Sequence, residues 1–271
     1  MYICPVCQKA LIESTQDTSK TLRCEQGHSF DRHKKGYVNL LLAHNKRSKQ
    51  PGDDGGMVAG RRAFLNAGYY QPLAKKIADT MLAQGIKQVL DAGCGEGYYL
   101  KQLLDREPDM KAFGFDISKP AIQLASHYKT IEWAVASSAR MPYPDAFFDA
   151  VLSVFSRVES DEFYRVLKPK GFVVFAGPGP EHLMALRQLI YSDIREYATD
   201  KHQSYFSEQF TLVNTLELKV PFLLDSQDQI QNLLSMTPHS QRMTREGAER
   251  LGAVEHLQDS ADFRLYLYQK K

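Results

Sequence analysis

Four residues with metal-binding side chains lie within the first 28 positions of this 271-residue chain. Cys4 and Cys7 form a Cys-x2-Cys pair, and after sixteen intervening residues Cys24 and His28 form a Cys-x3-His pair. Two close pairs on separate turns can converge on one tetrahedral ion, and thiolate ligands favour zinc. Because four protein ligands leave no position for water, we expect a structural zinc site. The alternative is a set of free buried thiols beside an unrelated histidine.

A second group of residues that could do chemistry lies in the stretch VLDAGCGEGYYL, residues 89–100. A short apolar run ends there in a G-x-G-x-G turn made by Gly93, Gly95 and Gly97. Glycines let the backbone approach a ligand closely, and open parallel sheets bind ligands at this edge. Asp91, two residues before the first glycine, would repel a pyrophosphate but suits the amino-acid part of a cationic cofactor.

Another carboxylate follows at the end of the next predicted strand. Asp116 lies nineteen residues after Gly97, where an acid typically accepts the ribose hydroxyls of an adenosine. Cys94 and Glu96 complete the glycine turn, and we interpret Cys94 as a small residue beside the ligand because it has no evident base or metal partner. These residues predict a nucleoside cofactor, and a nucleotide-binding fold of another kind is the alternative.

Alternating predicted strands and helices surround these residues. Strands are expected at 87–93, 110–118, 130–136, 148–155, 171–177, 215–220 and 262–269. Helices are expected from residue 61 and at 96–105, 119–128, 160–168, 180–198 and 225–235. This alternation is typical of βαβ units, and it predicts an α/β Rossmann-like fold with a mostly parallel, seven-stranded sheet.

The first 62 residues differ in charge from the rest of the chain. They hold eleven Lys and Arg against six acids, a net charge of +5 in a chain whose total is +2. We divide the chain into a zinc module at 1–33, a basic linker at 34–62 and a larger domain at 63–271. The stretch GYVNLLL in the linker is expected to pack, extended, on the zinc module. The basic excess suggests a polyanionic partner, although a solvated charged linker would also explain it.

Compartment and membrane association can also be judged from the sequence. No basic-then-apolar leader precedes the first cysteine pair, and the longest apolar runs are about half as long as a membrane span. We therefore expect a cytoplasmic protein without membrane contact.

The whole pattern resembles the RlmA family of bacterial methyltransferases, which act on guanine N1 of large-subunit ribosomal RNA. The resemblance extends over nearly the whole chain and includes the zinc-ligand pattern. The further matching segments are GYVNLL (36–41), AFLNAGYYQPL (63–73), LDAGCGEGYY (90–99), FDIS (115–118), LKPKG (167–171), GPGPEHL (177–183) and MTP (236–238).

This resemblance implies a class I S-adenosylmethionine-dependent methyltransferase with a small N-terminal zinc-binding domain. It also implies a homodimer that binds a hairpin of 23S ribosomal RNA, gripped in part by the zinc domains. Tyr70, the loop around Gly95, and His182 would line the cofactor pocket. Tyr70 could instead be a core aromatic residue, and His182 could only cap the helix that follows it.

One segment departs from the family pattern. Where the family reads close to YAP after the fourth strand, this chain reads FSRVES at 155–160, on the side that accepts the methyl group. Glu159 and Asp161 are the nearby carboxylates, but both suit a solvated loop or a helix start equally well, and we assign no catalytic residue.

Two other functions remain open from the sequence. A small-molecule methyltransferase would explain the large domain but not the zinc module or its basic excess. A catalytically inactive, zinc-containing RNA-binding protein would explain the zinc module, whereas the intact glycine turn and acids argue against it.

Overall fold

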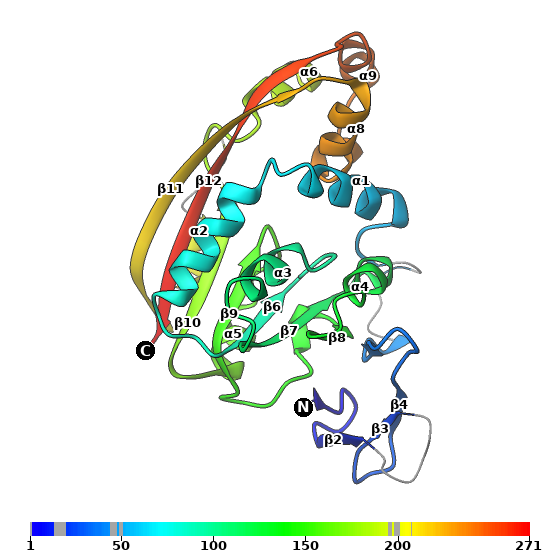
Figure 1. The fold of residues 1–271 in the computed structure, drawn as a ribbon, viewed down its shortest axis with the longest axis vertical. Coiled ribbons are helices and arrows are strands. Elements are labelled where there is room, and N and C mark those ends of the chain that lie inside the picture. Colours follow the sequence, from blue (N-terminus) through cyan, green and yellow to red (C-terminus); the bar gives the residue numbers. More distant parts are fainter. Residues whose placement is uncertain are drawn as a thin grey trace.

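The computed structural model describes residues 2–13, 20–43, 48, 51–194, 197, 201–206 and 208–271, with the backbone alone at 201–203. It consists of a small β-module at the N-terminus and a larger α/β domain (Figure 1). Among the described helices, none combines the length and the apolar character that a bilayer-spanning segment requires.

The N-terminal module is a four-stranded antiparallel sheet in the order β1-β2-β3-β4. Its strands are β1 (Tyr2–Ile3), β2 (Ala10–Glu13), β3 (Thr21–Arg23) and β4 (Ser29–Asp31). Contacts on both sides of the module hold it against the larger domain. The N–H of Ile3 donates to the carbonyl of Pro142 at 3.0 Å, and Arg32 pairs with Glu132, also at 3.0 Å.

An eight-stranded sheet forms the centre of the larger domain, in the order β11-β12-β10-β9-β6-β7-β8-β5. The strands are β5 (Val38–Asn39), β6 (Gln88–Ala92), β7 (Lys111–Asp116), β8 (Glu132–Val135), β9 (Phe148–Val154), β10 (Leu167–Pro178), β11 (Phe210–Leu224) and β12 (Leu257–Lys270). All neighbours are parallel except β10 with β12 and β11 with β12. The strand order reverses between β6 and β9, which is where open sheets of this kind bind ligands.

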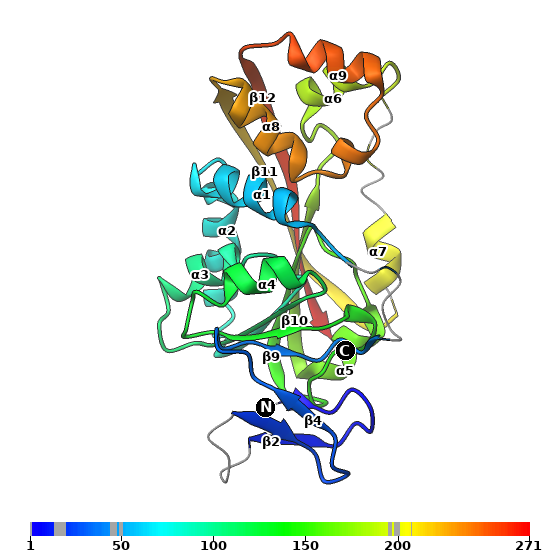
Figure 2. The same ribbon diagram turned by 90° about the vertical axis from the view of Figure 1, so that its right-hand side faces the viewer.

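Helices cover both faces of this sheet (Figures 1 and 2). On one face lie α1 (Gly55–Asn66), α2 (Gln71–Leu82), α3 (Tyr98–Leu104) and α4 (Lys119–Ala125), and on the other α5 (Ser160–Val166) and α7 (Lys201–Phe206). Each face has its own cluster of buried apolar side chains. Burial on both faces explains why β6 and β9 are mostly apolar instead of alternating between apolar and polar residues.

The strands β11 and β12 extend beyond the rest of the sheet, away from the N-terminal module (Figure 1). Their far ends carry α6 (Met184–Ile190), α8 (Gln227–Ser235) and α9 (Arg245–Gly252). Helix α1 packs against α8, and the approach is close because a Cβ at Gly60 would lie 2.0 Å from the Ser235 hydroxyl. Helix α1 therefore links the parallel part of the sheet to the end of the extended ribbon by packing against both α4 and α8.

The structure differs from the sequence-based expectations in several elements. The single helix expected from residue 61 is divided into α1 and α2, and α7 and α9 were not expected. Helix α1 begins at Gly55, inside the predicted linker, because the Asp54 carboxylate accepts the N–H groups of the first turn. The GYVNLLL segment contributes β5, which pairs with β8 and adds an eighth strand to the larger sheet instead of packing only on the zinc module. The helix expected at 180–198 is confined to α6 at Met184–Ile190, since Leu183 has a positive φ of 52° and Tyr191 is extended. Residues 195, 196 and 198 of that prediction lie outside the described residues.

Candidate functional site

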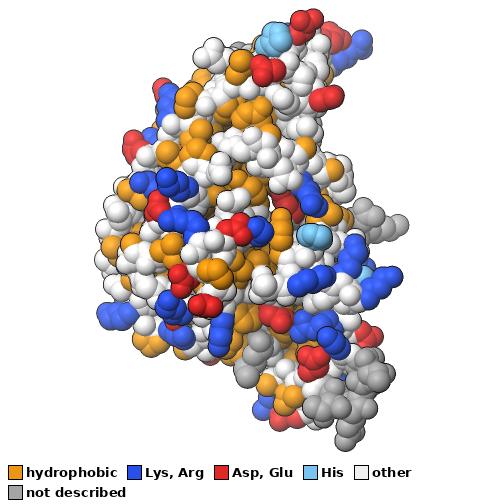
Figure 3. All heavy atoms as spheres, viewed as in Figure 1, with side chains coloured by type: hydrophobic (Ala, Val, Ile, Leu, Met, Phe, Trp, Pro, Cys, Tyr) orange, Lys and Arg blue, Asp and Glu red, His pale blue; other side chains and the backbone are white. Residues whose placement is uncertain are grey.

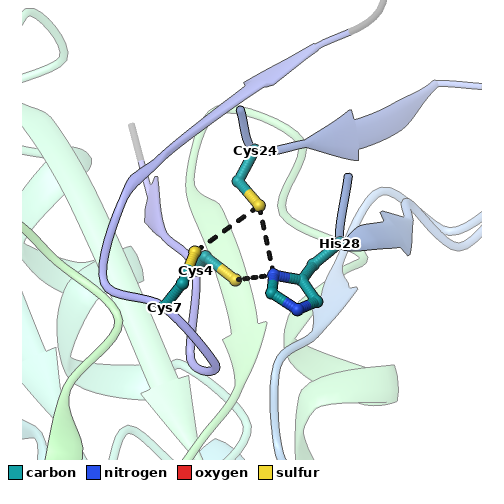
Figure 4. Close-up of side chains that lie close together, drawn as sticks. All are labelled: Cys4, Cys7, Cys24 and His28. Carbon is teal, nitrogen blue, oxygen red and sulfur yellow. Dashed lines mark hydrogen bonds between the residues drawn. The ribbon is translucent and has the colours of Figure 1, made fainter. Parts of the chain in front are cut away.

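The four predicted zinc ligands converge in the N-terminal module (Figure 4). Cys4 and Cys7 lie on the turn between β1 and β2, and Cys24 and His28 on the turn between β3 and β4. Gly27, with a φ of 82°, permits the second turn and bonds back to the carbonyl of Cys24. All four ligand atoms lie within 4.8 Å of one another.

The spacing of these atoms fits a tetrahedral zinc ion. Bond lengths of about 2.3 Å to sulfur and 2.0–2.1 Å to nitrogen give ligand–ligand separations of about 3.8 and 3.5 Å. The Sγ atoms of Cys7 and Cys24 are 3.6 Å apart, and Nδ1 of His28 lies 3.6 Å from Cys4 Sγ and 3.3 Å from Cys24 Sγ. The thiols are free, and their separation is far beyond a disulfide bond. The prediction of a Cys3His zinc site is confirmed.

The glycine turn connects β6 to α3 at the edge of the sheet. Gly93, Gly95 and Gly97 all have positive φ, at 81°, 55° and 83°. A Cβ at Gly93 would lie 2.6 Å from Cβ of Ser156, and one at Gly97 would lie 2.5 Å from the Trp133 ring. Backbone conformation and close packing therefore both require glycine at these two positions.

Asp91 lies at the carboxyl end of β6, beneath this turn, and is 1% exposed. Burial, and to a smaller extent the nearby Asp116, raise the pKa of Asp91 to about 8. Its Oδ2 atom is buried without a hydrogen-bond partner among the described residues. A buried carboxylate in this state fits a ligand that brings a cationic group, such as the ammonium of an amino-acid moiety.

Asp116 ends the neighbouring strand β7 and lies directly against the glycine turn. Its Oδ2 accepts the N–H of Gly95 at 2.9 Å, and its Oδ1 accepts the N–H of Ser118 at 2.8 Å. Burial raises the pKa of Asp116, and these two hydrogen bonds oppose that shift. The bonds fix the carboxylate at the sheet edge, with further lone pairs able to accept the hydroxyls of a ribose.

The other two residues of the turn face the protein rather than the sheet edge. The Cys94 thiol is buried, 3.1 Å from where a Cβ at Gly114 would lie, and burial holds its pKa well above the usual value. Glu96 is also buried, which raises its pKa, while Arg61 and Arg62 of α1 lower it. Cys94 therefore packs beneath the turn, and Glu96 lies beside the arginines of α1.

Helix α1 and the residues before it lie across the glycine turn. Arg61 Nη2 pairs with Asp53 Oδ2 at 2.5 Å, and Arg61 Nη1 lies 3.4 Å from where a Cβ at Gly95 would be. The hydroxyl of Ser118 donates to the carbonyl of Asp53 at 2.7 Å. The Asp53–Arg61 pair thus borders the Asp116 side of the sheet edge.

Tyr70 and His182 are 112 residues apart in sequence, yet they meet beside the ends of β9 and β10. The Tyr70 hydroxyl lies 3.5 Å from Nε2 of His182. His182 Nδ1 lies 2.8 Å from the carbonyl of Asp262, which can only accept, so Nδ1 carries the proton and Nε2 accepts. Burial lowers the pKa of His182 to about 4. This ring is neutral near pH 7, and Leu183 rather than His182 occupies the N-cap of the following helix.

Phe155 follows β9 and borders the same place. It is 43% exposed and has a φ of 51°, a conformation that is strained for an aromatic residue. Its ring centroid lies 6.3 Å from that of Tyr70 and 5.6 Å from that of His182. The turn is held by the N–H of Phe155, which donates to Ala176, and by the Ser156 hydroxyl, which donates to Ala92 at 2.6 Å.

Sequence reasoning missed Arg61 and did not assign a role to Phe155. Phe155 opens the FSRVES segment, so the departure from the family pattern was the signal that pointed to it. Arg61 belongs to an ordinary amphipathic helix, and nothing in its sequence neighbourhood distinguishes it. The two carboxylates noted in the same segment are engaged elsewhere, because Glu159 pairs with Arg157 and Asp161 accepts from Gln209.

Comparisons with known proteins agree with both halves of the structure. Residues 2–49 match the family model described as "RlmA, N-terminal", which is a zinc ribbon, and residues 89–171 match the model described as "Methyltransferase domain". Two solved structures share the fold at 18% identity. The MccD protein has a TM-score of 0.50 and covers 74% of this chain and 98% of its own. A chain of the complex between the Haloferax volcanii Trm112 methyltransferase activator and its methyltransferase partner has a TM-score of 0.51 and covers 81% of this chain and 98% of its own.

Two curated relatives match most of the chain. The YxjB protein of Bacillus subtilis strain 168, whose name assigns it the reaction of a 23S rRNA guanine-N1 methyltransferase, is 35% identical over 251 residues, 88% of this chain and 86% of its own length. The 23S rRNA (guanine(748)-N(1))-methyltransferase of Streptomyces fradiae is 31% identical over 244 residues, 88% of this chain and 84% of its own.

The donor set of Asp91, Asp116 and the glycine turn fits S-adenosylmethionine, which is cationic and has a ribose but no phosphate. The match to the RlmA zinc ribbon and the matches to these relatives over most of the chain lead to one conclusion. The chain belongs to the RlmA family of 23S rRNA guanine-N1 methyltransferases, a family of S-adenosylmethionine-dependent enzymes with an N-terminal zinc ribbon.

Proposed function

We propose that this protein transfers a methyl group from S-adenosylmethionine to N1 of a guanine in a hairpin of 23S ribosomal RNA. The observation that carries the proposal is the joint presence, in one chain related to these enzymes over most of its length, of a complete zinc-ligand set and an intact cofactor edge at Asp91, Gly93–Gly97 and Asp116. The Streptomyces fradiae relative is named for guanine 748, and we leave the position in this protein's substrate to experiment.

We propose that Asp91, Asp116 and the glycine turn hold the cofactor, together with Tyr70 and His182. The cofactor supplies the sulfonium methyl group. Asp91 would provide a carboxylate for its ammonium, a role supported by the unpartnered Oδ2, and Asp116 would accept the ribose hydroxyls. The neutral His182 keeps Tyr70 oriented toward the end of β9, where Phe155 lies. Cys94 and Glu96 support the turn from beneath and from the α1 side.

The accepting base is proposed to lie on Phe155. This ring is the large exposed aromatic side chain at the carboxyl end of β9, and stacking on an aromatic ring is a common way to hold an unpaired base. Guanine N1 is on the Watson–Crick edge, so the target must be unpaired or pulled from its stem. The enzyme's main contribution to such a displacement is alignment of donor and acceptor.

We propose that the two parts of the chain have different functions. Residues 1–33, together with the basic linker at 34–62, recognise the RNA, and residues 63–271 carry out methyl transfer in the cytoplasm. The zinc-ribbon match runs to residue 49, and α1 within the linker reaches the cofactor edge through Arg61. This placement supports a direct connection between RNA recognition and the cofactor site.

We also propose that the protein is a homodimer. The long strand β11 is an edge strand of the sheet and exposes Leu212, Val213 and Leu223, each more than 40% accessible. Exposed apolar residues on an edge strand favour association with another chain. Light scattering on the purified protein should give twice the mass of the chain, and a monomer at micromolar concentration would contradict the proposal.

The proposed reaction is tested by methyl incorporation with labelled S-adenosylmethionine. Purified, zinc-loaded protein should label unmodified 23S ribosomal RNA, and digestion of the RNA should yield 1-methylguanosine. Labelling of a metabolite extract but not RNA would favour a small-molecule methyltransferase instead. Failure of the cofactor to bind in calorimetry, with RNA binding retained, would favour an inactive RNA-binding protein.

A further inference from the structure

A basic pocket lies between the chain that joins the two modules, helix α1 and the end of helix α4. Its volume is about 240 Å³, and its walls include Lys35, Arg62, His127 and Lys129. Figure 3 shows Lys and Arg side chains gathered on the right-hand part of this face, over the α4 region and above the zinc module. We propose that this pocket binds a backbone phosphate of the RNA substrate, an inference that rests on the proposed function.

The charge of the pocket is one-sided. No Asp or Glu lines it. Within the part of the chain that the structure describes, none of Lys35, Arg62 and Lys129 forms an ion pair with a carboxylate. Arg62 also acts on the buried Glu96, whose pKa it lowers without forming an ion pair with it. Three cations that line one pocket without an ion-paired carboxylate favour an anionic ligand.

Backbone contacts hold the pocket in shape. Lys129 Nζ donates to the carbonyl of Ser126 and to the carbonyl of Lys35, both at 2.7 Å. It thereby ties the chain that follows the zinc module to the end of α4. An ammonium group has three N–H donors, so one remains for a ligand. Gln123, which also lines the pocket, bonds the Tyr37 hydroxyl at 3.5 Å and strengthens the same junction.

The position of the pocket relative to the cofactor edge identifies its ligand. Arg62 lines the pocket, while its neighbour Arg61 lies over the glycine turn at Gly95. One helix thus places adjacent arginines in the two sites, and the linker that leaves the zinc module borders the pocket through Lys35. An RNA strand that enters the cofactor edge and reaches the zinc module would pass this pocket, and what it presents there in every sequence is its phosphate backbone.

The proposal predicts a change in the salt dependence of RNA binding. Affinity for an unmodified, fluorescently labelled 23S rRNA hairpin is measured by anisotropy over a series of KCl concentrations, with the full zinc-loaded chain. Each phosphate contact contributes about 0.7 to 0.9 to the slope of log affinity against log salt concentration. The variants R62Q and K129Q should each lower the slope by about that amount and weaken binding to every hairpin sequence alike. K129R should restore it.

Lys75→Gln is the matched control, because Lys75 is an exposed cation on α2, outside the pocket. It removes the same charge and should leave the slope unchanged. Zinc content of both variants and cofactor affinity of K129Q should equal those of the parent protein, which excludes misfolding. Equal slopes for R62Q and the parent protein, or an equal loss in K75Q, would overturn the proposal. If R62Q and K129Q lower the slope as predicted but the parent protein transfers no methyl group to the RNA, the phosphate site is supported and the proposed reaction is contradicted.

Discussion

Asp91 couples cofactor binding to a proton, and this coupling can be measured. Its carboxyl group is buried beneath the glycine turn with a pKa of about 8, so it is protonated in the free protein near pH 7. A cofactor ammonium beside it favours the carboxylate, and the complex is therefore formed with release of a proton. Below pH 8 the dissociation constant should fall about tenfold for each pH unit gained, because one pKa unit corresponds to a factor of ten.

The size of the expected change in cofactor affinity follows from the pKa of Asp91. Between pH 6 and pH 8 the affinity should rise by up to about 100-fold and then become constant, because Asp91 is ionised above its pKa in both states. Asp91→Asn should remove this dependence. At pH 8 it should also weaken binding by roughly 10- to 150-fold, since hydrogen bonds to charged groups contribute about 1.5–3 kcal/mol.

Calorimetry with S-adenosylhomocysteine provides the assay, because this ligand keeps the ammonium and does not react. Titrations at pH 6, 7 and 8 in two buffers of different ionisation enthalpy report the number of protons released. Asp116 and Cys94 are the other titratable groups beside Asp91, and the Asn variant separates their contribution. Equal affinities at pH 6 and pH 8 with no proton released by the parent protein would refute the reasoning.

Cofactor affinity should rise with pH, whereas the free energy of unfolding of the cofactor-free protein should fall. Its folded state holds the Asp91 proton up to about pH 8, whereas the unfolded chain loses it near pH 4. The contribution of Asp91 to the free energy of unfolding therefore decreases as the pH rises through this window. Asp91→Asn should lose less stability than the parent protein between pH 5 and pH 8 in urea unfolding, and identical pH profiles would contradict this.

The remaining predictions concern the metal, the glycine turn and the accepting aromatic ring. Cys24→Ser should lose the zinc and most RNA affinity but keep cofactor affinity, as measured by metal analysis and calorimetry, because the two sites lie in separate modules; loss of cofactor binding as well would contradict this. Gly97→Ala should destabilise the protein by about 2–4 kcal/mol in urea unfolding, since its Cβ meets Trp133 at 2.5 Å. Gly85→Ala, which has a positive φ but open space around it, should cost only about 1–2 kcal/mol, and equal losses would show that the contact is unimportant. Phe155→Ala should lower kcat/KM for RNA by roughly 5- to 150-fold, as expected for about 1–3 kcal/mol of stacking, with cofactor affinity unchanged. Phe155→Tyr should keep activity, and an active Ala variant would exclude stacking.

Features with a local physical cause could be predicted from the sequence. The zinc ligands lie on two short turns, so their spacing alone brings each pair together. The β6–α3 turn needs glycine at Gly93 and Gly97 for conformational and steric reasons, and these residues stand out in any reading of the chain. Asp116 follows from the regular length of a βαβ unit.

Features that depend on long-range packing could not be predicted in the same way. Tyr70 and His182 were named only through a resemblance, because their contact is made by elements 112 residues apart. β5 is two residues long, and only its neighbour β8 makes it a strand. The positions of Arg61 and Arg62 depend on where α1 begins, which the Asp54 cap determines within a stretch rich in glycine. Pairing and packing of this kind leave no periodic signal in the sequence.

Reverse transcription tests the central claim most directly. Unmodified 23S ribosomal RNA is incubated with the zinc-loaded protein and S-adenosylmethionine and is then copied by a reverse transcriptase. A methyl group on guanine N1 blocks Watson–Crick pairing, so the account predicts one new stop next to a guanine in a hairpin. The stop should require the cofactor and disappear in Asp91→Asn at low cofactor concentration. Methyl incorporation into the RNA without any such stop would contradict the account.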